Sequence, residues 1–131
     1  MKNVFFSLIL ILGFNCNSFI LKKGLFYSYE DNNEFTTITR DSIFEIHEQV
    51  SGLKSKYIIN WKNKFVYTLR LKEIAIPGKK FKKVNENFNN KYISNKILSI
   101  NKNYYIYRST FYNSNKKESS YLDTIYINKI K

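Results

Sequence analysis

The sequence predicts an all-β protein, built as a single antiparallel meander of about eight strands that forms a small barrel or an open curved sheet. Apolar residues recur with a period of two from Gly24 onward, which is the pattern of half-buried strands. Clusters of Asn, Gly, Ser and Lys interrupt the pattern at short intervals, as turns do. Aromatic residues make up 18% of the chain, and their large apolar area favours a folded domain over a disordered one.

Three strands joined by short polar turns are expected first. They cover residues 25–30, 35–40 and 43–50, with turns at 31–33 and 41–42. In the third strand, Phe44 and Ile46 share one face, and Glu45 and His47 share the other. Three consecutive strands of this kind indicate a meander.

The cleanest alternation follows, in a predicted hairpin of residues 56–62 and 65–72. Its inward side chains are the largest of any strand pair and its outward face is the most charged, so we expect it at the centre of the sheet. The inward residues are Tyr57, Ile59, Trp61, Phe65, Tyr67, Leu69 and Leu71.

The alternation stops at residues 76–90, which hold the only Pro and are expected to form a loop, with at most a short helix over Phe81, Val84 and Phe88. Three more strands are predicted at residues 92–100, 104–112 and 121–130. Residues 101–103 form a tight turn in this interpretation, and residues 113–120 form a polar loop.

The chain has a formal net charge of +12, which would attract anions such as acidic lipid or nucleic acid. The same bias toward Lys, Asn, Ile, Tyr and Phe, the residues of AT-rich codons, runs through the whole sequence, so we interpret the charge as composition rather than as selection for a partner. The densest basic run is Lys79, Lys80, Lys82 and Lys83, expected to be a solvated loop or a contact with anionic lipid headgroups.

The N-terminus has the layout of an export signal. Met1–Asn3 is short and basic, and an eleven-residue run, Val4–Phe14, is apolar except for Ser7 and Gly13. A membrane-spanning helix needs about 20 apolar residues, which disfavours a permanent span. Run length alone also allows a buried core helix, but the position at the extreme N-terminus favours a signal.

The only Cys of the chain, Cys16, stands where the apolar run ends, and the segment resembles a bacterial lipoprotein signal whose Cys is lipidated. The predicted domains are therefore a signal peptide (1–15), a lipidated Cys and tether (16–23) and one β domain (24–131). In the Bacteroidetes-type lipoproteins that this segment resembles, an acidic tract after the Cys is associated with display at the cell surface. The resemblance therefore implies, for a chain without that tract, the outer membrane facing the periplasm. Secretion after cleavage near Ser18 is the alternative.

Few residues support catalysis. Glu45 and His47 can in principle act as an acid–base pair, but no nucleophile or third orienting group accompanies them, and such a pair is expected on the surface. One His and one Cys give no ligand set for zinc or haem, and phosphate-binding and nucleophile-elbow motifs are missing from the sequence. We therefore predict no enzyme activity, no metal and no cofactor. A periplasmic enzyme is kept as a third hypothesis, and a position of Glu45 and His47 in a cleft would favour it.

Binding remains the expected role, as a binding or structural accessory module of the cell envelope. The alternative is a small calycin-like barrel that carries an apolar ligand, with a set of large aromatic residues as its lining or core: Tyr57, Trp61, Tyr67, Tyr105 and Tyr107. Aromatic and basic residues also interleave around Arg108, as in single-strand nucleic-acid binders, but an exported protein rarely meets nucleic acid.

Several short segments resemble a family of small flavobacterial (Bacteroidetes) proteins, many of them lipoproteins of unknown function. Some members carry a DNA topoisomerase IV label, which a chain of this length without a nucleotide loop does not support. The resemblance implies no catalytic residues. Where many members have an acidic residue and a Cys, this chain has Lys64 and Phe65. The matching segments are Gly24 with Phe26, Ile38-Thr39-Arg40, residues 52–57 with Ile59 and Trp61, Tyr67-Thr68-Leu69 and Tyr107-Arg108-Ser109-Thr110.

If Cys16 is lipidated, Cys16→Ala should abolish both fatty-acid labelling and recovery of the protein in the membrane fraction, because the substitution removes the acceptor thiol. Labelling that persists in the variant, or that is never seen in the wild type, would leave only secretion.

Overall fold

The computed structural model describes residues 21–128. The predicted signal peptide, Cys16 and most of the tether lie outside this range, as do the last two residues of the predicted final strand and Lys131. Within the described part of the chain, no helix is both long and apolar enough to cross a membrane.

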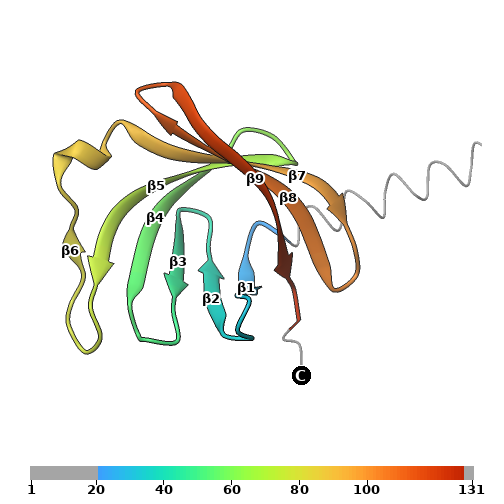
Figure 1. Ribbon diagram of the computed structural model, residues 1–131, viewed down its shortest axis with the longest axis horizontal. Helices are drawn as coiled ribbons and strands as arrows, with labels where there is room; N and C mark the ends of the chain where they lie inside the picture. Colours follow the sequence, from blue (N-terminus) through green and yellow to red (C-terminus); the bar gives the residue numbers. More distant parts are fainter. Residues whose placement is uncertain (1–20, 129–131) are drawn as a thin grey trace, which may run out of the picture.

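The described chain forms one antiparallel sheet that closes into a barrel (Figure 1). The strand order is β4-β3-β2-β1-β9-β8-β7-β5, and β4 pairs back onto β5, while β6 adds a ninth strand beside β5. The all-β prediction and its barrel alternative are confirmed. The strands are β1 (Gly24–Tyr29), β2 (Phe35–Arg40), β3 (Phe44–Glu48), β4 (Lys54–Trp61), β5 (Val66–Ala75), β6 (Lys82–Lys83), β7 (Lys91–Ile100), β8 (Tyr104–Asn113) and β9 (Lys116–Tyr126).

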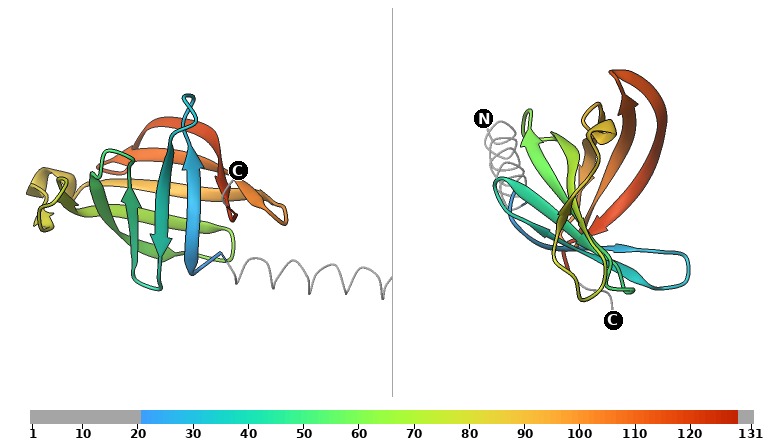
Figure 2. Two further views of the ribbon diagram at one scale, coloured as in Figure 1. Left: turned by 90° about the horizontal axis from the view of Figure 1, so that it is seen from below. Right: turned by 90° about the vertical axis from the view of Figure 1, so that its left-hand side faces the viewer.

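The strands wrap around a common axis, with β1–β4 on one side and β7–β9 on the other (Figure 2). The predicted central position of the β4–β5 hairpin is wrong for this reason: in a closed barrel, every strand has a neighbour on each side. The alternation of large inward side chains is as expected, since Ile59, Tyr67 and Leu69 are all buried.

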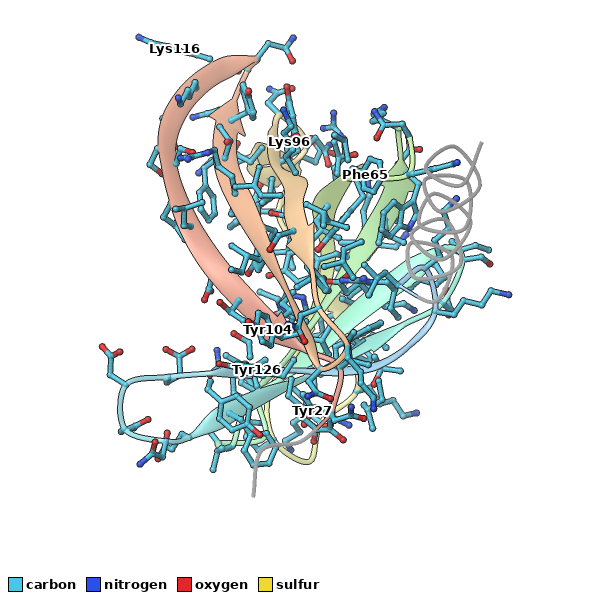
Figure 3. The ribbon with its side chains drawn as sticks, turned by 90° about the vertical axis from the view of Figure 1, so that its right-hand side faces the viewer. Tyr27, Phe65, Lys96, Tyr104, Lys116 and Tyr126 are labelled. Atoms are coloured by element: carbon cyan, nitrogen blue, oxygen red, sulfur yellow. The ribbon has the colours of Figure 1, made fainter. Side chains whose placement is uncertain are left out.

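The barrel closes where β9 meets β1, through the single residue pair Tyr27 and Tyr126. Figure 3 shows these two residues close to Tyr104, at the end of the barrel away from Lys116. The ring of Tyr126 packs edge-on against that of Tyr29, with 5.2 Å between the ring centres, and lies 5.9 Å from that of Tyr104. Aromatic packing therefore accompanies the short hydrogen-bonded seam.

Two turns illustrate how local chemistry sets the register. Asp41 Oδ1 accepts hydrogen bonds of 2.7 Å from the backbone N–H groups of both Ile43 and Phe44, which fixes the predicted turn between β2 and β3. At the β8–β9 turn, Ser114 and Asn115 both have positive φ, of 51° and 63°, as a tight two-residue hairpin requires.

The predicted polar loop at residues 113–120 is wrong. β9 already begins at Lys116, and Lys116, Lys117 and Ser119 pair with the end of β8. This part of the hairpin lacks apolar alternation because it extends past the barrel, where water covers both faces. Residues 76–90 are mainly a loop, as expected, but they also contain β6 and a short 3₁₀ helix, η1 (Glu86–Phe88), capped by the Asn85 side chain.

One end of the barrel interior is filled around a buried arginine. Arg40 is 3% exposed and its guanidinium makes four hydrogen bonds. Nε donates to Glu45 Oε2 at 2.7 Å, Nη1 to the backbone carbonyl of Leu21 at 2.6 Å, and Nη2 to the hydroxyls of Tyr67 (3.2 Å) and Tyr105 (3.0 Å). We call this set, with the rings of Phe26 and Trp61, the arginine cluster.

The rings of the arginine cluster stack against the guanidinium. The Arg40 Cζ atom lies 4.6 Å from the ring centre of Phe26, 4.8 Å from that of Tyr67 and 5.9 Å from that of Trp61. Burial alone would lower the pKa of Arg40, but the Glu45 carboxylate and the two tyrosine hydroxyls raise that pKa, so the guanidinium stays charged. The cluster closes this end of the barrel, which we call the Leu21 end.

Removing one partner of this ion pair should be far more harmful than removing both. Arg40→Met leaves the Glu45 carboxylate buried without its cation, so the free energy of unfolding should fall by about 3–5 kcal/mol, whereas Arg40→Met/Glu45→Leu should recover most of that loss. Urea unfolding measures both variants.

The control is Lys54→Met, which breaks an exposed pair with Glu48 (3.9 Å) and should cost less than about 1 kcal/mol. A double variant as unstable as Arg40→Met alone would contradict this interpretation of the cluster.

Candidate functional site

The other end of the barrel holds a polar cavity of about 240 Å³. All eight barrel strands contribute to its wall, and it reaches solvent past the exposed side chains of Glu30, Gln49 and Tyr121. We call it the mouth cavity. Its lining residues are Ser28, Glu30, Thr36, Ile38, Glu45, His47, Gln49, Ser55, Tyr57, Leu69, Ile93, Asn95, Tyr107, Ser109, Tyr121, Asp123 and Ile125.

Glu45 and His47 face this cavity, so their predicted surface position is wrong. Alternation along β3 separates its two faces but does not say which one is inside. Here the apolar face is outside, where the Lys56 ammonium lies 4.2 Å from the ring centre of Phe44. The orientation of β3 could have been inferred from the β2–β3 hairpin. A turn at residues 41–44 places Glu45 directly opposite Arg40, so the two opposite charges share one face of the sheet.

Glu45 connects the arginine cluster to the mouth cavity. It is 1% exposed, with Oε2 bound to Arg40 and Oε1 at 2.6 Å from His47 Nε2. Burial alone would raise the pKa of Glu45, but Arg40 and His47 together lower it to about 2, so the carboxylate is ionised at neutral pH. An ionised carboxylate only accepts, which makes His47 Nε2 the donor of this hydrogen bond.

The opposite wall carries a buried acceptor without a partner. Asn95 on β7 is 4% exposed, and within residues 21–128 no donor pairs with its Oδ1 atom. Beside it on the wall, the Tyr107 hydroxyl donates to Asp123 Oδ2 at 3.4 Å, and burial, then the Asp123 charge, raises the pKa of Tyr107. Buried acceptors normally have hydrogen-bond partners, so the unpaired Oδ1 of Asn95 lowers the stability of the fold.

An apolar recess of about 210 Å³ adjoins the mouth cavity and shares Tyr57, Leu69 and Ile93 with it. It lies where β5 and β7 separate, beyond their last paired residues Leu69 and Ile93. Phe88 of η1 and Phe111 of β8 complete its apolar wall. The two spaces together offer a polar surface beside a hydrocarbon one.

The five aromatic residues predicted as lining or core divide between these two roles. Tyr57 and Tyr107 line the mouth cavity. Trp61, Tyr67 and Tyr105 pack in the arginine cluster, where both tyrosine hydroxyls accept from Arg40 and the rings of Trp61 and Tyr67 lie against it. Sequence periodicity placed all five inside but could not separate the filled end from the hollow one.

The predicted basic run is exposed. Lys79 and Lys80 lie in the loop after β5, and Lys82 and Lys83 form β6, which pairs with Ile74 and Glu73. Figure 1 shows β6 at the side of the barrel away from β1. Contact between these lysines and anionic lipid stays a prediction.

The barrel also has an outer groove of about 460 Å³ across β4, β5, β7 and β8. Arg70 lines this groove, and its guanidinium donates to the Asn89 carbonyl at 2.9 Å. The guanidinium also lies 4.8 Å from the ring centre of Tyr92, which stacks on Tyr112. These groups satisfy one another, whereas the mouth cavity contains an unsatisfied one. We therefore take the mouth cavity as the candidate site.

The chemistry available in the mouth cavity is limited. His47 is held by a carboxylate, as a general base would be, but no nucleophile in the described range is hydrogen-bonded to it. The same range contains no group of three or more His, Cys, Asp or Glu residues that could hold a metal ion. The absence of enzyme activity stays a prediction.

Models of known protein families and curated protein sequences contain no match to this chain. The resemblance to flavobacterial lipoproteins therefore stays a prediction, and the site has to be interpreted from its own geometry.

The lowered pKa of Glu45 predicts a specific acid sensitivity. In the unfolded chain this carboxyl titrates near pH 4.5, so its contribution to stability is complete above that pH and is lost as the pH falls toward about 2. Urea unfolding at steps from pH 6 to 2 should show a steep loss of stability, and Glu45→Gln should have a flatter profile, although it is less stable at pH 6.

Asp41→Asn is the control, since backbone N–H groups of Phe44 and Ile43 lower the pKa of that exposed carboxyl as well. A Glu45→Gln profile that runs parallel to that of the wild type would contradict the prediction.

Proposed function

We propose that this protein is a binding module of the cell envelope that takes a small polar molecule into the mouth cavity. The observation that carries the proposal is the unpaired Oδ1 of Asn95, buried in the cavity wall. A buried acceptor without a partner costs about 1–3 kcal/mol, and a ligand that donates to it would remove that cost. The other polar groups of the wall, those of His47, Tyr107 and Asp123, would then fix the orientation of the ligand.

The size of the cavity limits the ligand. A cavity of about 150 Å³ holds one benzene molecule, so the 240 Å³ of the mouth cavity leaves room for about ten non-hydrogen atoms. The adjoining recess accommodates a short hydrocarbon portion. A long apolar ligand, as a calycin-like carrier would hold, fits less well, because the arginine cluster fills the rest of the interior.

Lipid anchoring completes the proposal. Its support is the sequence alone: an apolar run of signal-peptide length that ends at the only Cys, Cys16. In this arrangement the lipid holds the barrel at the outer membrane, facing the periplasm, where small polar molecules pass. Lys79, Lys80, Lys82 and Lys83 are available for anionic headgroups or another envelope partner.

Asn95→Leu should separate binding from stability. The substitution replaces an amide whose Oδ1 is unsatisfied by an apolar side chain of similar size, so the free energy of unfolding should stay the same or rise by about 1 kcal/mol, whereas ligand binding should be lost. Binding is measured by NMR with a panel of neutral, cationic and anionic polar molecules of up to about ten non-hydrogen atoms. In the wild type, shifts should concentrate at Asn95, His47 and Tyr57.

Asn60→Leu is the matched control, because Asn60 is an exposed amide on β4 outside the barrel interior. It should keep the wild-type shifts. If the wild type shows no shifts in the cavity, or if Asn95→Leu keeps them, the cavity is not a binding site for this class of molecule.

A further inference from the structure

We infer that the ligand of the mouth cavity is a small organic cation, a protonated amine. This rests on the proposed function and names its ligand class. The chain has 22 Lys and Arg against 10 Asp and Glu, yet the described residues that line the cavity include Glu30, Glu45 and Asp123 and no Lys or Arg. A basic protein has thus placed three carboxylates and no Lys or Arg around this cavity.

Two of the three carboxylates are available to a ligand. Glu45 is neutralised by Arg40 from the side of the Leu21 end. Asp123 accepts from the Tyr107 hydroxyl and from the Thr124 backbone N–H, which leaves acceptor capacity on both of its oxygens. Glu30 lies at the rim and is exposed. A cation entering from solvent therefore meets Glu30 first and Asp123 further in.

The unsatisfied group in the wall also calls for a donor. Asn95 Oδ1 is an acceptor, and an ammonium group is a donor with no acceptor of its own. An anionic ligand has no such donor and would leave Asn95 Oδ1 without a partner.

Aromatic rings suit a cation as well. Tyr57, Tyr107 and Tyr121 all line the mouth cavity, and the face of a tyrosine ring attracts an organic cation. The neighbouring recess would hold the hydrocarbon portion of the amine against Leu69 and Ile93. A bare metal ion would gain nothing from these rings and finds no cluster of three ligating side chains in residues 21–128.

The overall charge of +12 does not prevent this. Charges further apart than about 8 Å are largely screened at physiological ionic strength, so the lysines on the outside of the barrel weigh little against carboxylates in contact with the ligand. Local charge therefore decides which ion is favoured in the cavity.

Three five-carbon probes test the inference: pentylammonium, 1-pentanol and pentanoate, titrated at pH 7 into the full-length protein and followed by NMR. Pentylammonium should bind at least tenfold more tightly than 1-pentanol, with shifts at Asn95 and Asp123, and pentanoate should not bind. Added salt should weaken the binding of pentylammonium and leave the affinity for 1-pentanol unchanged.

Two isosteric variants locate the effect. Asp123→Asn should weaken the binding of pentylammonium fivefold or more without changing the affinity for 1-pentanol. Glu30→Gln should weaken the binding of pentylammonium less, because Glu30 is exposed. Glu48→Gln is the matched control: it removes the same charge from β3, but that side chain pairs with Lys54 outside the barrel. If Asp123→Asn fails to fold, Glu30→Gln at the rim still tests the direction of the change.

The outcomes separate the two proposals. Equal affinities for pentylammonium and 1-pentanol, tighter binding of pentanoate, or equal effects of Glu30→Gln and Glu48→Gln would overturn the cation inference and leave a polar binding site in place. No shift in the cavity with any of the three probes, together with none from the wider panel, would overturn both.

Discussion

The ion pair between Arg40 and Glu45 organises the interior of this barrel. Both charges are removed from water, so each requires hydrogen-bond partners, and these come from β3, β5, β8 and Leu21. The requirement fixes the β2–β3 register, orients two tyrosine hydroxyls and holds His47 by its Nε2 atom. A core of aliphatic residues would place no such demands, so the pair specifies one arrangement where an apolar filling would allow several.

The same pair divides the barrel into two unlike halves. On the side of the Leu21 end, rings and the guanidinium fill the space, so nothing can enter. On the other side, Glu45 is part of the wall of the mouth cavity. Its Oε1 atom accepts from His47 Nε2 and so holds the imidazole ring in that wall. One buried carboxylate thus serves stability through Oε2 and the site through Oε1.

Much of the fold follows from alternation and turn chemistry, and the sequence predicted it for that reason. The regular pattern in β4 and β5 identified their inward residues, and Asp41 and the residues 101–103 marked real turns. Alternation failed where its physical basis was missing. The polar face of β3 lies inside the barrel because Glu45 pairs there with Arg40. The first residues of β9 are exposed to solvent on both faces. The site was beyond prediction because Asn95, His47 and Asp123 come from three different strands and meet only when the barrel closes.

Closure of the barrel also affects how the chain folds. The seam between β1 and β9 joins the first and last of the described strands, so its formation requires the longest loop closure among them, and the paired backbone there is a single residue pair. Until the rings of Tyr29, Tyr104 and Tyr126 pack across it, two strand edges stay open to other chains. The packing of these tyrosine rings therefore affects how well the newly made chain avoids aggregation while it folds, and it also holds the finished barrel together.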